Sequence, residues 1–225
     1  MDVAIIPARA GSKRIKNKNI KLFNNKHLIY YSIKAAIKSN LFKRVIVSTD
    51  SKKISNIAKK YGAEVPFLRP KSLSDDYTST QKVINHAIDQ LKNKDLIRNV
   101  CCIYATAPFI DYKDLIKANK ILKKDKNTFV FTAAKFHSSA FRSFYFKKKK
   151  LVKAFPKFMS SRSQDLKDTY FDVGQFYYAN KKKWLKGDIF SEKSKIIQIP
   201  YLKSYDLNNI EDWKVLNKIK KIKNL

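Results

Sequence analysis

The sequence predicts an α/β fold with a doubly wound, mainly parallel sheet, formed by one domain that spans residues 1–225. Short apolar runs rich in β-branched residues alternate along the chain with amphipathic stretches of helical period, and this βαβαβ order requires a mainly parallel sheet. The chain is also able to bury a core, because 44% of its 225 residues are hydrophobic. No linker rich in Pro, Gly or Ser divides it into separate parts.

The first half of the chain begins this alternation. Short runs rich in Val and Ile predict buried strands, and apolar side chains at three- and four-residue spacing predict helices between them. One helix should end at Gly62, because glycine readily adopts the left-handed conformation that closes many helices. The expected elements are a strand at 3–6, a helix at 27–39, a strand at 44–49, a helix at 51–61 and a short strand at 65–68.

The second half continues the order and then interrupts it. Residues 78–81 (TSTQ) have the form of a capping box, in which a Thr and a Gln side chain satisfy backbone N–H groups at the start of a helix. An aromatic, basic stretch with hairpin character then predicts an inserted arm that leaves the sheet. The expected elements after residue 81 are a strand at 100–104, a helix at 111–122, a strand at 128–134, the arm at about 137–169 and a returning strand at 170–179.

The last stretch, residues 212–225, has two interpretations. Trp213, Leu216, Ile219 and Ile222 recur at helical spacing, with lysines on the opposite face. A helix lying on a membrane surface has this pattern, and so has a terminal helix that packs on the sheet. We expect the packed helix, which is the commoner arrangement, and no membrane partner.

The charge of the chain raises the possibility of a polyanionic partner. There are 49 Lys and Arg residues against 18 Asp and Glu, which gives a formal net charge of +31. The lysines are spread along the whole chain, and the dense runs at 147–150 and 218–223 lack the interleaved aromatic residues of single-strand binders. We therefore expect no specific nucleic acid partner, although a basic nucleic-acid-binding α/β module remains the alternative from another functional class.

Scarce residue types exclude several other classes. The four glycines lie too far apart to form a G-x-G-x-x-G or a P-loop motif, and G-x-S-x-G and H-E-x-x-H are absent. Cys101 and Cys102 are adjacent, so they would face opposite sides of a strand and form neither a disulfide nor a metal pair. No run reaches the roughly 18 apolar residues that span a bilayer, and residues 1–6 do not resemble a signal peptide. We expect a cytoplasmic protein.

The loop after the first strand is the first candidate binding site. Ligands of open α/β sheets bind beyond the carboxyl ends of the strands, and residues 7–19 (PARAGSKRIKNKN) follow such an end. Gly11 allows backbone N–H groups to approach an anion, while Arg9, Lys13 and Lys18 can neutralise several phosphate oxygens. The residues predict a polyphosphate ligand.

The order of residues in this loop resembles the N-terminal signature of the cytidylyltransferases that activate sialic-acid-type sugars as CMP conjugates. The signature is carried by residues 8–14 (ARAGSKR), followed by Lys18 and Asn19. Further blocks follow in the order of that family, and the resemblance extends over essentially the whole chain. They are residues 48–50 (STD), 68–70 (LRP) and 74–80 (SDDYTST). The resemblance implies a Rossmann-like nucleotidyltransferase fold with an inserted dimerisation arm.

Three blocks resemble the pseudaminic acid branch of the family. They are residues 102–109 (CIYATAPF), 162–166 (RSQDL) and 174–177 (GQFY). The sialic acid branch more typically has a Gln-Pro-Thr-Ser-Pro block and an Asn-Gly-Ala/Ser-Ile-Tyr block, and neither is present here. The alternative within the enzyme class is a CMP-N-acetylneuraminic or CMP-legionaminic acid synthetase.

The resemblance also implies roles for individual residues. The implied CTP-binding residues are Ala8, Arg9, Gly11, Ser12, Lys13, Lys18, Asn19, Arg69, Ser79 and Thr80. The implied sugar-binding residues are Tyr104, Thr106, Arg162, Gln164, Gln175 and Tyr177. Arg162 and Gln164 lie on or near the arm, which in this family builds a dimer and can reach the partner's active site, so a homodimer is expected. Tyr104 and Tyr177 could instead be core aromatics, whereas Gln175 in an apolar strand is harder to explain as packing.

The metal site is where the sequence departs from the family pattern. The family carries an Asp-x-Asp pair, followed by Thr and an acidic residue, near its C-terminus, but here residues 205–213 are YDLNNIEDW. Alternate residues of an extended segment share one face, so Asp206 and Asn208 could both address one Mg²⁺ ion. The implied reaction is transfer of CMP from CTP to a nine-carbon 2-keto acid sugar, with Lys18, Arg9 and Asp206 as catalytic residues and pyrophosphate as the second product.

Overall fold

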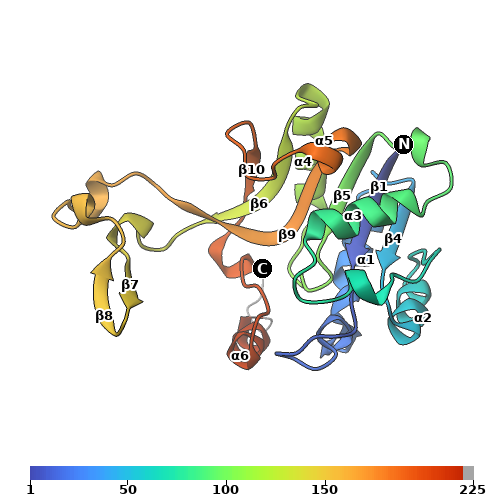
Figure 1. The fold of residues 1–225 in the computed structure, drawn as a ribbon, viewed down its shortest axis with the longest axis horizontal. Helices are drawn as coiled ribbons and strands as arrows, with labels where there is room; N and C mark the ends of the chain where they lie inside the picture. Colours follow the sequence, from blue (N-terminus) through green and yellow to red (C-terminus); the bar gives the residue numbers. More distant parts are fainter. Residues whose placement is uncertain (220–225) are drawn as a thin grey trace.

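The structure is a computed structural model that describes residues 1–219. Its centre is a six-stranded sheet with the order β10-β6-β9-β5-β1-β4 (Figure 1). Neighbouring strands are parallel except at β9, which runs antiparallel to both β5 and β6. The strands are β1 (Asp2–Pro7), β4 (Arg44–Ser48), β5 (Asn99–Ile103), β6 (Phe129–Lys135), β9 (Tyr170–Asn180) and β10 (Lys195–Gln198). The prediction of a mainly parallel α/β sheet is confirmed.

Helices cover both faces of this sheet. Buried side chains of α1 (Leu28–Lys38), α2 (Lys52–Lys60) and α4 (Tyr112–Lys124) belong to the apolar cluster on one face. Those of α3 (Thr80–Asp89) and α5 (Lys181–Lys186) belong to the cluster on the other face. Strand β1 contributes to both clusters because its successive side chains point to opposite faces. This three-layer arrangement explains why the strands read as continuous apolar runs.

Several helix boundaries follow from local chemistry that the sequence carries. The Ser51 hydroxyl accepts the Ile54 N–H at the start of α2, and Gly62, just beyond its end, has a φ of 93°. Helix α3 is capped by Ser79 instead of Thr78, so the expected capping box does not form. The Gln81 side chain instead donates to the carbonyl oxygens of Trp184 and Gly187, which ties α3 to the region of α5.

The predicted strand at 65–68 is wrong. Only one bridge forms there, between Glu64 and Ile46, and the chain then leaves the sheet. Pro66 explains the difference, because proline has no N–H to continue a ladder. Strand β10 and helix α5 are present although the sequence patterns did not predict them.

The segment between β6 and β9, called the arm below, lies outside the six-stranded sheet. It connects β6 to β9, and its tip is a hairpin of β7 (Phe144–Lys147) and β8 (Lys150–Lys153) that lies far from the sheet (Figure 1). Lys148 and Lys149 form the turn in the left-handed region, at φ values of 47° and 63°. A second small hairpin, β2 (Leu22–Phe23) and β3 (Lys26–His27), follows the loop after β1.

The C-terminal helix packs at a different place from the one expected. Helix α6 (Ile210–Ile219) buries Leu216 against Ile15, Phe23 and Leu28, a third apolar cluster beside the sheet. The Trp213 ring meets the Phe23 ring edge to face, with centroids 6.1 Å apart. The expectation of packing on the sheet itself is therefore wrong, and residues 220–225 of the expected helix lie outside the described part. Within residues 1–219 no helix is long and apolar enough to cross a membrane.

Candidate active site

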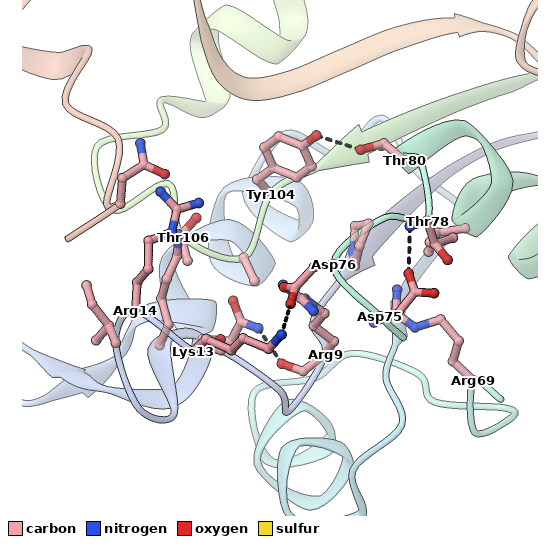
Figure 2. A pocket seen from close by; sticks show the side chains of 18 of the residues that line it. Arg9, Lys13, Arg14, Arg69, Asp75, Asp76, Thr78, Thr80, Tyr104 and Thr106 are labelled. Atoms are coloured by element: carbon pink, nitrogen blue, oxygen red, sulfur yellow. Dashed lines mark hydrogen bonds and ion pairs between the residues drawn. The ribbon is translucent and has the colours of Figure 1, made fainter. Parts of the chain in front are cut away.

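A polar cavity of about 330 Å³ opens at the carboxyl ends of β1 and β5 (Figure 2). Four separate segments supply its walls: the loop after β1, the segment that precedes α3, the end of β5 and the segment that precedes α6. The predicted residues that line it are Arg9, Ser12, Lys13, Lys18, Asn19, Arg69, Thr80, Tyr104, Thr106, Asp206 and Asn208. The structure thus brings together residues that are up to about 200 positions apart in sequence.

Side-chain hydrogen bonds fix the loop after β1. Asn19 is buried, and its Nδ2 donates to the Arg9 carbonyl oxygen at 2.8 Å. The backbone N–H of Ala10 donates to Asp50 Oδ1 at 2.8 Å, which ties the loop to the end of β4. These two hydrogen bonds fix the backbone of the loop, which holds its cationic side chains above the sheet.

Lys18 links this loop to the C-terminal segment. Its Nζ donates to the carbonyl oxygen of Leu207, and the carboxylate of Asp206 lies close enough to favour its charge. Burial nevertheless lowers the pKa of Lys18 below its ordinary value, and the positive charges of Arg14 and Arg9 lower it further. This half-buried lysine lies between two walls of the cavity: the loop after β1 and the segment that precedes α6.

Arg9 and Lys13 share one carboxylate, that of Asp76. Lys13 Nζ lies 2.7 Å from Asp76 Oδ2, and the Arg9 guanidinium binds Oδ1 of the same group (Figure 2). The hydrogen bonds from Lys13 and Arg9 lower the pKa of Asp76 to about 2. Two basic groups therefore converge on a single point of the cavity, which the two carboxylate oxygens of Asp76 occupy.

Arg69 is the buried cation of the cavity. Its backbone N–H donates to the carbonyl oxygen of Thr49, just beyond β4, and only 4% of the residue is exposed. Nε donates to Ser74 Oγ at 3.2 Å, whereas Nη2 is buried without a hydrogen-bond partner among the described residues. Burial lowers the pKa of Arg69, although its ordinary value is so high that the group stays charged. A buried N–H that lacks an acceptor favours a ligand that supplies one.

A second cavity, of about 520 Å³, adjoins the first. The two share Tyr104, Asp206 and Asn208 in their walls. Tyr104 Oη lies 2.7 Å from Thr80 Oγ1, and burial raises the pKa of Tyr104 to about 12, so the phenol is neutral at physiological pH (Figure 2). The predicted residue Tyr177 lines the second cavity, where its Oη donates to Asp172.

The segment before α6 holds the two residues predicted to bind a metal ion. Asn208 Nδ2 donates to Asp206 Oδ2 at 3.0 Å, and the Leu207 N–H donates to Asp206 Oδ1 at 2.7 Å. Asn209 and Asp212 cap the following helix reciprocally: Asp212 Oδ2 accepts the Asn209 N–H, and Asn209 Oδ1 accepts the Asp212 N–H. Among the described residues no group of three or more His, Cys, Asp or Glu side chains could hold a metal.

The structure places several predicted residues outside both cavities. Gln175 is buried, and its Nε2 donates to the Lys203 carbonyl oxygen at 2.8 Å, so it anchors the segment that leads to Asp206. Arg162 pairs with Asp165 on the arm, and Gln164 lines a separate cavity at the base of the arm. Ala8 is a core residue, Gly11 faces open space and Ser79 caps α3. None of these six residues lines the first or the second cavity, so their positions do not support direct contact with a ligand there.

Sequence reasoning missed four acidic residues of the site. Asp75 and Asp76 line the first cavity, and Asp172 and Asp212 line the second. Asp75 accepts the backbone N–H groups of Tyr77 and Thr78, which shapes the turn that presents Asp76. A signal for Asp172 was present, because an acidic residue two positions before Gly174 interrupts a largely apolar strand.

Comparison with known proteins agrees with this geometry. Residues 3–204 match the cytidylyltransferase family model. The chain belongs to the cytidylyltransferase family. It is 42% identical over 225 residues to the pseudaminic acid cytidylyltransferase of Campylobacter jejuni, an alignment that covers 97% of both chains. The N-acylneuraminate cytidylyltransferase of Escherichia coli is 40% identical over 119 residues, which cover 53% of this chain and 27% of that one.

The fold of this cytidylyltransferase is similar to that of a solved sugar-nucleotide synthetase. The structure of CMP:2-keto-3-deoxy-manno-octonic acid synthetase complexed with CTP superposes with a TM-score of 0.72 and 12% sequence identity. The superposition covers 97% of this chain and 98% of the other. At this identity the likeness establishes the fold alone.

Proposed function

We propose that this cytidylyltransferase transfers CMP from CTP to a nine-carbon 2-keto acid sugar, pseudaminic acid, and releases pyrophosphate. The observation that carries the proposal is the 42% identity to a pseudaminic acid cytidylyltransferase over nearly the whole of both chains. Matching to the N-acylneuraminate enzyme covers only about half of this chain. The two adjoining cavities support a reaction between two substrates, one in each cavity.

The first cavity suits the nucleotide. Arg9 and Lys13 converge on the Asp76 carboxylate, and phosphate oxygens of a triphosphate would take the place of that carboxylate. The unpartnered Nη2 of Arg69 supports contact with an uncharged acceptor, such as the carbonyl oxygen of cytosine. Thr80, whose hydroxyl is bonded to Tyr104, lies at the border with the sugar cavity.

Asp206 and Asn208 fit a weakly charged Mg²⁺ site. They offer one carboxylate and one amide oxygen at the border of the two cavities, and Mg²⁺ commonly takes few protein ligands together with water and phosphate oxygens. A Mg²⁺ ion held there would neutralise charge on the phosphates and lower the pKa of the attacking hydroxyl. The Asn208 amide would have to rotate, because its Nδ2 faces Asp206 in this structure.

The reaction needs positioning more than covalent chemistry from the protein. The anomeric hydroxyl of the sugar forms a bond to the α-phosphorus of CTP in line with the bond that breaks, and pyrophosphate leaves with the electron pair of that bond. Lys18, Arg9 and Lys13 stabilise the negative charge that moves onto the β- and γ-phosphates. Lys18 donates to the carbonyl oxygen of Leu207, the residue after Asp206. It therefore connects the loop that binds the phosphates to the border of the two cavities, where the hydroxyl attacks.

The arm suits a second copy of the chain. Its hairpin exposes Phe144, Phe146 and Leu151, which share one face of the hairpin, and an exposed apolar face favours coverage by a partner. In a homodimer, Arg162 and Gln164 would reach the sugar cavity of the partner and not their own. We also place the reaction in the cytoplasm, where CTP is made.

Product analysis tests the proposed function. The protein is incubated with pseudaminic acid, Mg²⁺ and each of CTP, UTP, ATP and GTP, and pyrophosphate and the sugar product are measured. We expect pyrophosphate and a CMP-sugar with CTP alone. Pyrophosphate release that does not depend on the sugar, or no release with any nucleotide, would contradict the proposal.

A further inference from the structure

The second cavity has an unusual charge for a site that takes an acidic sugar. Three carboxylates line it, those of Asp172, Asp206 and Asp212, and no Lys, Arg or His is among its lining residues within the described chain. The rest of its wall is largely aromatic. The chain has 49 Lys and Arg residues, so a cavity wall without a cation differs from what the overall composition would give.

Asp172 is held rigidly at the β9 side of this cavity. Its Oδ1 accepts the Gly174 N–H at 3.0 Å, and its Oδ2 accepts the Tyr177 hydroxyl. Gly174 has a φ of 66°, a left-handed conformation that residues with a side chain rarely adopt, so glycine suits this turn of β9 beside Tyr104. The local backbone and one neighbouring phenol thus orient the carboxylate before any ligand binds.

The carboxylate of Asp172 has acceptor capacity left over. A carboxylate has about four acceptor positions, and the two hydrogen bonds described above use two of them. Within residues 1–219 Asp172 takes part in none of the ion pairs. Partial removal from water raises its pKa above the ordinary value, and the nearby charge of Asp206 raises it further. Substrate donors are therefore the natural partners of the remaining positions.

We infer that Asp172 accepts hydrogen bonds from uncharged donors of the sugar, its hydroxyl or acylamino N–H groups, and thereby fixes which way the acidic sugar enters. The inference rests on the proposed function. Two carboxylates repel each other, so the carboxylate of the sugar does not pair with Asp172. The second cavity offers it no cation among the described residues, whereas basic side chains such as Lys18 line the first cavity. A sugar whose carboxylate points toward the first cavity also presents its anomeric carbon, which bears that carboxylate, to the nucleotide.

Steady-state kinetics of an Asp172→Asn variant test this inference. The matched control is Asp188→Asn, because Asp188 accepts the N–H two residues on at the same distance of 3.0 Å but lines neither cavity. We expect the KM for pseudaminic acid to rise about tenfold or more in Asp172→Asn, because a hydrogen bond to a charged group is lost. The KM for CTP should stay within about twofold, and Asp188→Asn should behave as the unsubstituted protein.

A second variant keeps the test sharp if Asp172→Asn folds poorly. Tyr177→Phe leaves the carboxylate in place but removes the hydroxyl that orients it, and should raise the KM for the sugar in the same direction by a smaller factor. If the unsubstituted protein turns over and the KM for the sugar is unchanged in both variants, the inference about Asp172 is overturned and the proposed function stands. Equal changes in the KM for CTP and for the sugar would also overturn it. Absence of turnover by the unsubstituted protein would overturn the proposed function and the inference together.

Discussion

Lys18 joins the two ends of the chain at the site. It follows the first strand by only a short loop, and its ammonium group donates to Leu207, 189 positions later. Its pKa is lowered chiefly by burial, and the nearby Asp206 carboxylate opposes this effect. The residue is thus a partly buried cation. A charge in such an environment of lower dielectric interacts with phosphate more strongly than it would in water.

Replacing Lys18 by Ala should lower turnover by about two to three orders of magnitude, because one preorganised donor to the developing charge is lost. The variant should keep the fold, since the apolar cluster beneath the loop is untouched. Pyrophosphate release measures turnover, and thermal unfolding measures the fold. Lys16→Ala is the control, because Lys16 is exposed and does not line the nucleotide cavity. Near-normal pyrophosphate release by Lys18→Ala would refute the assigned role.

In the proposed metal site, Asn208 supplies an amide in place of a second carboxylate. An Asn208→Asp variant should need less Mg²⁺ for half-maximal activity, because a second carboxylate replaces an amide. Mn²⁺ binding followed by electron paramagnetic resonance, without either substrate, should tighten as well. The control is Asn209→Asp, which adds the same charge one residue later at the cap of α6, where aspartate is tolerated. Identical metal dependence of Asn208→Asp and the unsubstituted protein would show that Asn208 is not a ligand.

At the scale of elements, the arm exposes apolar side chains that no other part of the described chain covers. Phe146 and Leu151 pair across the hairpin, and they are 76% and 60% exposed. A two-stranded hairpin is marginally stable on its own in water, so these side chains need a partner surface. A second copy of the chain is the partner that the proposed function assigns to them.

A Phe146→Glu variant should weaken self-association, because a charge would be buried in the proposed interface. Light scattering after size-exclusion chromatography should give the mass of a dimer for the unsubstituted protein and a lower mass for the variant at micromolar concentration. Leu96→Glu serves as the control, since Leu96 is equally apolar and 63% exposed but lies in a short helical turn before β5. A monomeric mass for the unsubstituted protein would contradict the proposed homodimer.

The elements show where sequence patterns suffice and where they fail. Continuous apolar runs located β1, β4, β5 and β6 because these strands are buried on both faces. The run at 65–68 failed because Pro66 stops the ladder after one bridge, a local rule that the apolar pattern hides. Helix α6 has the periodicity expected of it, but periodicity cannot tell which apolar surface a helix meets, and here that surface includes Phe23.

The candidate site was predictable to the extent that its residues follow strand ends. Arg9 and Lys18 lie in the loop after β1, where topology alone predicts a ligand. Gln175 looked functional because a polar side chain in an apolar strand needs a partner, and the backbone carbonyl of Lys203 supplies one to its Nε2. The role of Asp76 could not be foreseen, since it depends on a turn that brings it to Arg9 across 67 positions.

At the scale of the whole molecule, the net charge of +31 has a limited meaning for function. The cations that line the first cavity are a few residues held above the sheet, whereas the second cavity has no cation among its described lining residues. The remaining lysines can attract CTP and an acidic sugar only over about 8 Å at physiological salt, because ions screen the field beyond that distance. The topology of the sheet, more than the total charge, decides where the two cavities lie.

The measurement that tests the proposed function most directly is kcat/KM with CTP for separate sugars, namely pseudaminic acid, legionaminic acid and N-acetylneuraminic acid. We predict that pseudaminic acid gives by far the highest value, with a CMP-sugar as the product and a requirement for Mg²⁺. An equal or higher kcat/KM for N-acetylneuraminic or legionaminic acid would contradict the assignment of the sugar. No turnover with any of the three, alongside tight and steeply salt-dependent binding to nucleic acid, would contradict the proposed reaction as a whole.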